Sequence, residues 1–395
     1  MQLAWPQRQI KEVCDVRIGR TPRRDSPKYW GGSAVWVTIS ELDGGTILDS
    51  KEHISDLAVA EVMPDPVPAG TLLFSFKLSI GKMAVAGVPL YTNEAIAALT
   101  IQDPENLDRD FLYYSLLHQS QGHTDAANHA VLGKVLNKSK VEGIQIPIPP
   151  ISEQRRIVDI LKRADGIRRL RKQAIQTARE LIPALFVDMF GDPATNPKGW
   201  PVFPLGELLI DVGYGCSTKA AAVASTGVPM LRMGNVMVDG RLDLSSIKYV
   251  ALSDDEKRKY SLEKGDILFN RTNSKDLVGK TGLWDGRFEA VAASYFIRVR
   301  VDRKHLNPTY LWVFMNTRFM KRRLFETARG AIGQANINAK EFKSFTIPLP
   351  PLTLQQEYEQ RLTQLAAILV QQSSAEETSE TSFKSLLHRA FRGEL

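Results

Sequence analysis

The sequence predicts an α+β fold in which two repeated mixed α/β modules are separated by two long antiparallel coiled-coil helices, with a pseudo-twofold relation between the halves. Three observations support this prediction: an internal repeat along the whole chain, strand patterns within each half, and a long amphipathic helix pattern at the end of each half. At 395 residues, the chain is also too long for one ordinary hydrophobic core.

The repeat is clearest at two proline-rich segments. Ile-Pro-Ile-Pro-Pro-Ile at 146–151 matches Ile-Pro-Leu-Pro-Pro-Leu at 347–352, an offset of 201 residues. Small loop insertions make such an offset drift, so the chain is read as a duplicated unit. Four further pairs match in the same order at offsets of 195 to 199 residues: Trp5-Pro6 with Trp200-Pro201, Gly70–Phe74 with Gly265–Phe269, Gly81-Lys82 with Gly279-Lys280, and Phe111-Leu112 with Tyr310-Leu311.

Each half has the same predicted plan, a module followed by a helix. Alternating β-branched and aromatic residues predict strands at 35–40, 71–75 and 291–301. Apolar residues at helical spacing predict short helices at 108–117 and 307–316. The predicted segments are a first module over 1–148, a helix over 149–195, a second module over 196–349 and a second helix over 350–395.

The long helices are predicted from their apolar stripes. After Pro150, Ser152 is a candidate N-cap, and apolar residues recur in steps of three and four from Ile157 to Leu185. In the second helix Thr353 is the candidate cap, and the polar stretch 371–382 interrupts the stripe. This stretch is either a break or a helix with a weak seam, and we favour a helix that presents a partner surface there. Antiparallel pairing would bury both stripes.

The bulk composition excludes several classes of protein. With Cys14 and Cys216 as its two cysteines and six histidines without ligand spacing, the chain gives no support for a disulfide framework or a metal site. No apolar segment has the length of a signal peptide or a membrane span, so we expect a cytoplasmic location. The net charge of +7 suits a polyanionic partner without proving one.

Polar clusters at matching strand ends suggest DNA contacts, because Arg, Asn, Lys and Ser side chains pair with base edges and phosphates. For any single residue, a solvated turn explains the pattern equally well, but recurrence in both halves favours DNA. A helix of about 39 residues spans about 58 Å, or about 17 base pairs. The candidate contacts are Thr38, Ser40, Lys77, Ser79, Lys82, Lys134, Lys138, Arg232, Asn235, Arg271, Asn273, Ser274, Lys280, Gln334 and Asn336.

The sequence gives little support for catalysis, and no catalytic residue is assigned. Gly279-Lys280-Thr281 lacks the earlier glycine of a phosphate-binding loop, because position 274 is serine. Glu341 and Lys343 fit half of a nuclease motif that is frequent by chance. Two alternatives therefore remain beside DNA recognition: a nuclease using these two residues, and a coiled-coil adaptor that never touches DNA.

The chain resembles the specificity subunit of type I restriction–modification systems over essentially its full length. The motifs that carry the resemblance are Ile146-Pro-Ile-Pro-Pro-Ile-Ser-Glu-Gln-Arg-Arg-Ile157, Ile347-Pro-Leu-Pro-Pro-Leu-Thr-Leu-Gln-Gln-Glu357, Phe190-Gly-Asp-Pro193 with Asn196-Pro-Lys-Gly-Trp-Pro201, Ala390-Phe-Arg-Gly-Glu-Leu395, Gly19-Arg-Thr-Pro22, and Tyr29-Trp-Gly-Gly32 before Val35-Trp-Val37.

The resemblance implies several properties that the residues alone do not. The modules would be target recognition domains, each reading one half of an asymmetric, interrupted double-stranded DNA site. The helices would be conserved spacers that dock two methyltransferase subunits. Those subunits would bind S-adenosylmethionine and methylate adenine, and motor–nuclease subunits would join them with ATP and Mg²⁺. No cofactor is expected on this chain itself.

Overall fold

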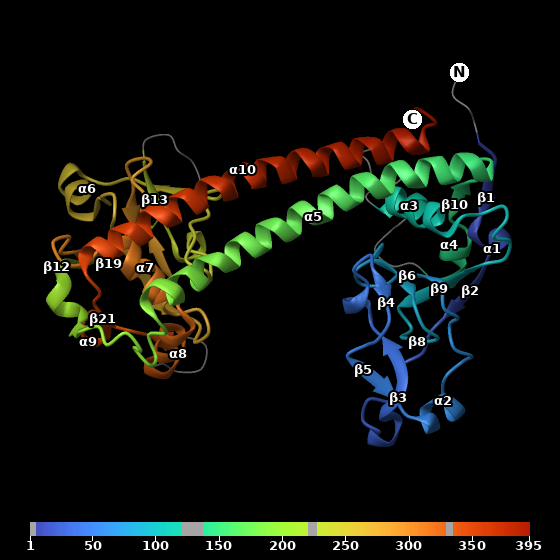
Figure 1. Ribbon diagram of the computed structural model, residues 1–395, viewed down its shortest axis with the longest axis horizontal. Coiled ribbons are helices and arrows are strands. Elements are labelled where there is room, and N and C mark those ends of the chain that lie inside the picture. Colours follow the sequence, from blue (N-terminus) through green and yellow to red (C-terminus); the bar gives the residue numbers. More distant parts are fainter. Residues whose placement is uncertain (1–4, 121–136, 220–226, 329–334) are drawn as a thin grey trace. The chain divides into compact units, whose positions relative to one another are not determined.

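The computed structural model describes residues 5–120, 137–219, 227–328 and 335–395 (Figure 1). The chain forms two compact units, of which the first comprises residues 1–172 and 374–395 and the second residues 173–373. Each unit therefore contains one globular module and about half of each long helix. The predicted Lys134 and Gln334 lie outside the described residues.

The first unit is built from two sheets, a strand pair and helices. Its strands are β1 (Gln7–Gln9), β2 (Cys14–Ile18), β3 (Trp30–Val37), β4 (Thr46–Ile47), β5 (Glu52–Ile54), β6 (Leu72–Ser75), β7 (Met83–Ala86), β8 (Tyr91–Thr92), β9 (Ile96–Ile101) and β10 (Gln145–Pro147). Its helices are α1 (Ile10–Val13), α2 (Asp56–Glu61), α3 (Arg109–Ser120), α4 (Lys138–Glu142), the start of α5 (Ile151–Phe190) and the end of α10 (Leu352–Phe391). The sheet orders are β2-β9-β6-β7-β4 and β5-β3-β8, and β1 pairs with β10.

The second unit repeats this plan. Its strands are β11 (Val202–Pro204), β12 (Leu209–Tyr214), β13 (Val228–Leu231), β14 (Lys248–Val250), β15 (Ile267–Asn270), β16 (Thr272–Asn273), β17 (Thr281–Leu283), β18 (Val291–Ala292), β19 (Phe296–Val301), β20 (Ala335–Asn336) and β21 (Thr346–Pro348). Its shorter helices are α6 (Asp254–Tyr260), α7 (Pro308–Asn316), α8 (Arg318–Thr327) and α9 (Ala339–Ser344). The sheet orders are β12-β19-β15-β17 and β14-β13-β18, with the pairs β11-β21 and β16-β20.

The repeat in sequence is therefore a repeat in structure. In both three-stranded sheets the central strand has one antiparallel and one parallel neighbour, β5 and β8 in the first unit and β14 and β18 in the second. The larger sheets match strand for strand except for β4. The α+β fold with two repeated modules and two long helices is confirmed.

Two predicted strands needed correction, and a third was confirmed. The strand expected at 291–301 is two strands, because β18 joins the three-stranded sheet and β19 the larger one, so the chain passes between sheets at 293–295. The strand expected at 35–40 ends at Val37, where Thr38 caps a short 3-10 helix. The strand expected at 71–75 is β6, and the two short helices are α3 and α7.

The long helices begin differently from the prediction. The expected caps Ser152 and Thr353 lie inside the first turns, because α5 starts at Ile151 and α10 at Leu352. A buried glutamine does the anchoring instead. Gln154 donates to Asn106 O and Pro149 O, both at 2.8 Å, and accepts from the backbone N–H of Asp108 at 2.9 Å.

The second unit has the same arrangement 201 residues later. Gln355 donates to His305 O at 3.1 Å and to Pro350 O at 2.8 Å, and it accepts from Asn307 N at 2.8 Å. Both glutamine side chains are fully buried. We call these two arrangements the glutamine clips. Each fixes the first turn of a long helix to the loop before the short helix of the preceding module.

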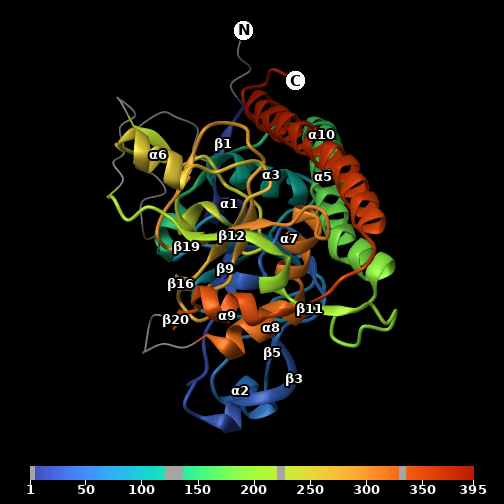
Figure 2. The same cartoon turned by 90° about the vertical axis from the view of Figure 1, so that its left-hand side faces the viewer.

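Within each unit the two long helices run side by side (Figures 1 and 2). In the second unit Phe186 and Phe190 of α5 pack on Tyr358 of α10, with ring centroids 5.8 and 5.1 Å apart. In the first unit Phe383 of α10 belongs to the same core as α3 and α5. Helix α10 continues without a break through 371–382, as favoured from the sequence.

The polar stretch of α10 contacts α5 through charged side chains rather than apolar ones. We call this contact the charged seam. Arg168 of α5 bonds Glu380 at 3.2 Å and lies 4.7 Å from the ring centroid of Phe383. The predicted apolar stripe is consequently wrong in part, because several of its members face away from the partner helix. The large apolar side chains exposed on the long helices include Ile167, Leu170, Leu181, Ile368 and Val370.

A buried carboxylate organises this seam in the first unit. Asp165 is 6% exposed and bonds Arg168 at 2.6 Å and Arg169 at 2.8 Å. We expect Asp165→Asn to lower the free energy of unfolding of the first unit by about 2 kcal/mol. This is less than the ~3–5 kcal/mol typical of a fully buried pair, because both arginines are partly exposed. Denaturant unfolding checks the value.

A surface ion pair of the same helix provides the control. Asp159 pairs with Arg163 at 2.9 Å, and both side chains are more than half exposed. Asp159→Asn should therefore change the free energy of unfolding by less than about 0.5 kcal/mol. Equal effects of the two substitutions would contradict a structural role for the buried seam.

Candidate nucleic-acid interfaces

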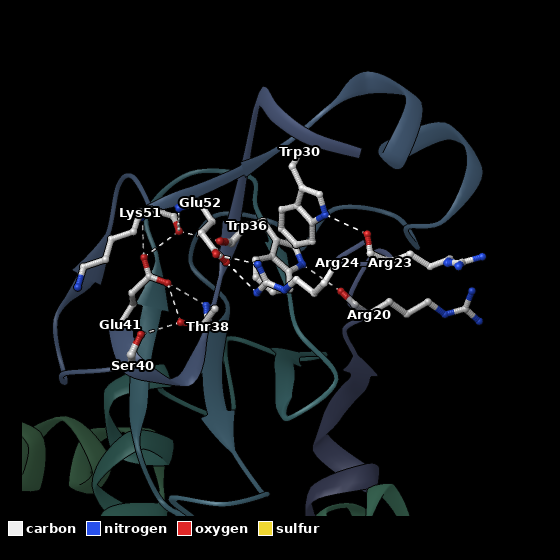
Figure 3. A network of polar contacts seen from close by, with 11 residues as sticks. Arg20, Arg23, Arg24, Trp30, Trp36, Thr38, Ser40, Glu41, Lys51 and Glu52 are labelled. Atoms are coloured by element: carbon white, nitrogen blue, oxygen red, sulfur yellow. Dashed lines mark hydrogen bonds and ion pairs between the residues drawn. The ribbon is translucent and has the colours of Figure 1, made fainter. Parts of the chain in front are cut away.

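In the first unit, the turn that follows β3 is held by the carboxylate of Glu41 (Figure 3). Glu41 accepts from Thr38 N at 2.8 Å, from the Ser50 hydroxyl at 2.8 Å and from Lys51 N at 2.9 Å. Burial alone would raise the pKa of this carboxyl, but the hydrogen bonds outweigh it and hold the pKa below its ordinary value. Glu41 thus stays ionised and shapes the turn, while Ser40 remains exposed on it.

Beside this turn lies an arginine–tryptophan cluster, which comprises Arg20, Arg23, Arg24, Trp30 and Trp36 (Figure 3). The Trp36 indole donates to Arg20 O at 3.0 Å and the Trp30 indole to Arg23 O at 3.1 Å. Arg24 lies 4.2 Å from the Trp30 ring centroid. The tryptophans therefore fix the backbone of a basic loop on the three-stranded sheet.

The arginines of this cluster are not equivalent. Arg24 forms two bonds to Glu52, at 2.7 and 2.9 Å, so its charge is already paired. The side chains of Arg20 and Arg23 extend away from the tryptophans in Figure 3, and both residues are exposed. Among the described residues, Arg23 pairs with its near neighbour Asp25 at 3.0 Å, and Arg20 makes one long bond, to Val62 O at 3.4 Å. Arg20 and Arg23 are thus available to contact a polyanion.

The predicted residues Lys77, Ser79 and Lys82 lie on the loop between β6 and β7. Ser79 and Lys82 are exposed, and Lys77 is partly exposed. Buried Ser75 shapes the loop, since its hydroxyl donates to Ser79 O at 2.5 Å and accepts from Lys82 N at 2.9 Å. Lys82 also lines a hollow of about 380 Å³ beside Arg168 of α5. The loop is therefore preformed, with its cations on the outside.

In the second unit the structure joins two of the predicted clusters. Strand β16, which contains Asn273, pairs with β20, which contains Asn336, and Thr272 lies opposite Asn336 in the register. The guanidinium carbon of Arg271 lies 4.7 Å from the ring centroid of Tyr214. We call Tyr214, Arg271, Asn273 and Asn336 the Arg271 surface.

The Arg271 surface is polar and rich in donors. Asn273 donates to Asn270 Oδ1 at 3.0 Å and accepts from Ser274 N at 2.9 Å, while Asn336 is exposed. In the described part of the chain, the Nε of Arg271 is buried without a hydrogen-bond partner. A guanidinium held on an aromatic ring beside the exposed amide of Asn336 has the chemistry that reads guanine and adenine edges.

The other predicted residues of this unit serve its own turns. Asn235 is 3% exposed, and its side chain accepts from Arg232 N at 2.8 Å and donates to Asp243 O at 2.9 Å. Lys280 is 9% exposed and donates to Met233 O at 2.8 Å. Lys138, in the first unit, is exposed at the start of α4 and pairs with Glu142 at 3.5 Å. Whether any of them contacts DNA stays a prediction.

Comparison with known proteins identifies the family. The family described as the type I restriction modification DNA specificity domain matches residues 3–179 and 197–376, one match per half of the repeat. The chain belongs to this family. It is a specificity subunit, a DNA sequence-recognition protein and not an enzyme, as the sequence predicts.

Individual relatives agree with this assignment. The MjaIX specificity subunit of Methanocaldococcus jannaschii is 24% identical, over 88% of this chain and 84% of the relative. The EcoKI specificity subunit of Escherichia coli is 28% identical, over 64% of this chain and 58% of the relative.

Solved structures show the same fold. The type I S subunit of M. genitalium has a TM-score of 0.57 at 15% identity and covers 98% of this chain and 96% of its own. A chain from a study of type I complex assembly and conformational transition has a TM-score of 0.58 at 20% identity, and covers 100% and 99%.

Sequence reasoning missed part of both surfaces of this specificity subunit. Arg20 lies within the motif Gly19–Pro22 and Arg23 directly follows it, and neither is among the predicted DNA contacts, although three arginines within five residues before two tryptophans are a signal for a basic loop. Tyr214 could not be found, because it lies 57 positions before Arg271 and meets it only through the fold. In the described ranges, no group of three His, Cys, Asp or Glu residues could hold a metal, and no helix is long and apolar enough to cross a membrane.

Proposed function

We propose that this specificity subunit recognises a bipartite double-stranded DNA site, with one half read by each module. The observation that carries the proposal is a duplicated scaffold with different surfaces at matching positions. At the matching Gly-Lys pair, Lys82 is exposed in the first unit whereas Lys280 is 9% exposed in the second, where the Arg271 surface presents the exposed Asn336 instead. Different donor and acceptor patterns on one scaffold suit two different base sequences.

The helices would set the spacing of the half-sites and dock two methyltransferase subunits. Exposed apolar residues on the long helices support this part of the proposal: Ile167 and Leu170 are 53% and 67% exposed, and Val370 is 71% exposed. Apolar side chains on an exposed helix face favour coverage by a partner protein. Motor–nuclease subunits would join this assembly, and S-adenosylmethionine, ATP and Mg²⁺ would bind to the partners in the cytoplasm.

The alternatives receive less support. Glu341, the candidate nuclease residue, caps α9: it accepts from Asn338 N at 2.9 Å, and its own N–H bonds the Asn338 side chain at 2.9 Å. A short helix cap explains this residue without catalysis. An adaptor that never contacts DNA would have no need for the exposed Arg20 and Arg23 or for the Arg271 surface.

A module exchange tests the proposal. Residues 1–148 are replaced by the corresponding module of a relative, and adenine methylation is mapped with the assembled complex. We expect one half of the methylated site to change and the other half to persist. Exchange of residues 196–349 should change the opposite half. Unchanged half-sites in both chimaeras, with methylation still active, would show that the modules do not read the sequence.

A further inference from the structure

Two lysines of the second unit, Lys280 and Lys321, lie at the short segment Gly279–Lys280, which is bonded to the loop that carries Arg271. Lys280 donates to Met233 O at 2.8 Å, and Lys321 of α8 donates to the carbonyl of Gly279, the preceding residue, at 3.0 Å. The same segment closes the loop that carries Arg271, since Gly279 N donates to Asn270 O at 2.8 Å and Asn270 N to Lys280 O at 2.9 Å. The two ammonium groups thus lie at the base of this loop.

Among the described residues, Asp239 is the acidic group that acts on the pKa of Lys321, and the pKa of Lys280 is affected by burial alone. Burial, followed by repulsion from Lys280, lowers the pKa of Lys321 to about 8, although Asp239 opposes the change. Burial likewise lowers the pKa of Lys280. Two neighbouring like charges, of which Lys280 is buried and Lys321 partly exposed, are unfavourable without an anion.

The loop that carries Arg271 adds N–H donors without partners in the described part of the chain. Asn270 is fully buried, and its Nδ2 has no hydrogen-bond partner among the described residues. The same holds for the Nε of Arg271, the next residue. Two ammonium groups and two unpartnered N–H donors around one loop match an anion that offers several oxygens.

The first unit lacks this arrangement at the matching position. Lys82, the counterpart of Lys280 in the repeat, is exposed, and buried Ser75 stands where the second unit has Asn270. The Ser75 hydroxyl is fully used within its loop, as a donor to Ser79 O at 2.5 Å and as an acceptor from Lys82 N. The donor excess is therefore a property of the second module and not of the common scaffold.

We propose that Lys280 and Lys321 bind one backbone phosphate of the second DNA half-site. This inference rests on the proposed function, because DNA that approaches the Arg271 surface supplies the phosphate. The contact anchors the reading loop on the backbone and carries no sequence information itself.

The charge state gives one expected property. With its pKa lowered to about 8, the Lys321 ammonium is charged at a pH well below 8 and loses its proton as the pH rises through that value. The phosphate contact therefore strengthens binding below pH 8 and weakens as the pH increases, with Lys280 and Asp239 as the charged neighbours. Lys321→Met should abolish this part of the pH dependence between pH 7 and 9.5.

The decisive experiment uses the full chain assembled with its methyltransferase subunits. Binding is measured to duplexes that contain the methylated sequence, with single phosphates of the second half-site replaced in turn by neutral methylphosphonate. We expect one position where the replacement weakens wild-type binding about 10-fold but weakens Lys321→Met binding less than about 2-fold. The slope of log K against log salt should also decrease by about one in the variant.

Several variants keep the outcome interpretable. Lys321→Arg retains the charge and should preserve both readouts, and Lys304→Met, at an exposed lysine of the same unit, should change neither. If Lys321→Met loses the same affinity on every duplex with an unchanged salt slope, the lysine is only a structural tether and the proposal is wrong. ATP binding to the wild-type chain that Lys321→Met abolishes would assign the pair to a free nucleotide and overturn the proposal.

A separate result distinguishes the failure of the proposed function. If the wild-type complex shows no sequence preference in the second half-site, both the function and the phosphate site are wrong. If sequence-specific binding is intact in every variant and on every duplex, only the phosphate site is wrong.

Discussion

Replacement of Gln355 by Leu is expected to lower the free energy of unfolding of the second unit by about 3 kcal/mol. The amide makes three hydrogen bonds in a fully buried position, to His305 O, Pro350 O and Asn307 N. Leucine would leave these backbone groups without partners, at about 1–3 kcal/mol for each group that stays buried and unpaired. Denaturant unfolding, with hydrogen exchange of β11 and β21 as a local readout, measures the effect.

The neighbouring residue is a matched control. Gln356 is exposed, and Gln356→Leu should change the free energy of unfolding by less than about 0.5 kcal/mol. The same pair of experiments in the first unit uses Gln154→Leu. A loss below 1 kcal/mol for both buried glutamines would mean that relaxed backbone or water satisfies the groups, and that the clips are not what fixes the helix starts.

Replacement of Arg271 by Ala is expected to weaken binding to the second half-site by about 1–3 kcal/mol, or about 5- to 150-fold. The guanidinium lies over Tyr214 and has a buried Nε without a partner among the described residues, so it is held in place and not neutralised. Methylation mapping with the variant should show relaxed preference at one base pair of one half-site. The other half-site should be unchanged.

An arginine of the same unit with a carboxylate partner serves as the control. Arg287 bonds Asp285 at 2.8 Å, and both side chains are largely exposed. Arg287→Ala should leave affinity and methylation sites unchanged. A uniform loss of affinity on all sequences with Arg271→Ala would make this residue a phosphate contact, and no loss at all would remove it from the interface.

The fold was predictable because its signals are local and repeated. The proline-rich segments, the periodicity of the long helices and the alternating strands each depend on neighbouring residues. The helix seam was harder, because Asp165, Arg168 and Glu380 replace apolar contacts with a charged network that requires both helices. Periodicity alone therefore assigned Ile167 and Leu170 to a buried stripe, although both are exposed.

The candidate site was predictable only as a set of loops. From the sequence, Asn235 and Arg271 are both predicted DNA contacts, but the structure distinguishes them. The side chain of Asn235 forms hydrogen bonds within its own turn, whereas the guanidinium of Arg271 lies over the ring of Tyr214. Burial and partner geometry decide which polar side chain remains free to bind, and these depend on contacts between segments far apart in the chain. The local sequence therefore does not predict these long-range contacts.

The glutamine clips bear on how such a protein can acquire new specificity. Gln154 contacts its module through Asn106 O and Asp108 N, and Gln355 contacts its own through His305 O and Asn307 N. All four are backbone atoms, which every amino acid supplies except that proline has no N–H. The joint between helix and module is therefore indifferent to the identity of the side chains around it. A foreign module with the same backbone path can be accepted without adapting the helices, so recombination can exchange one reader while the rest of the protein stays as it is.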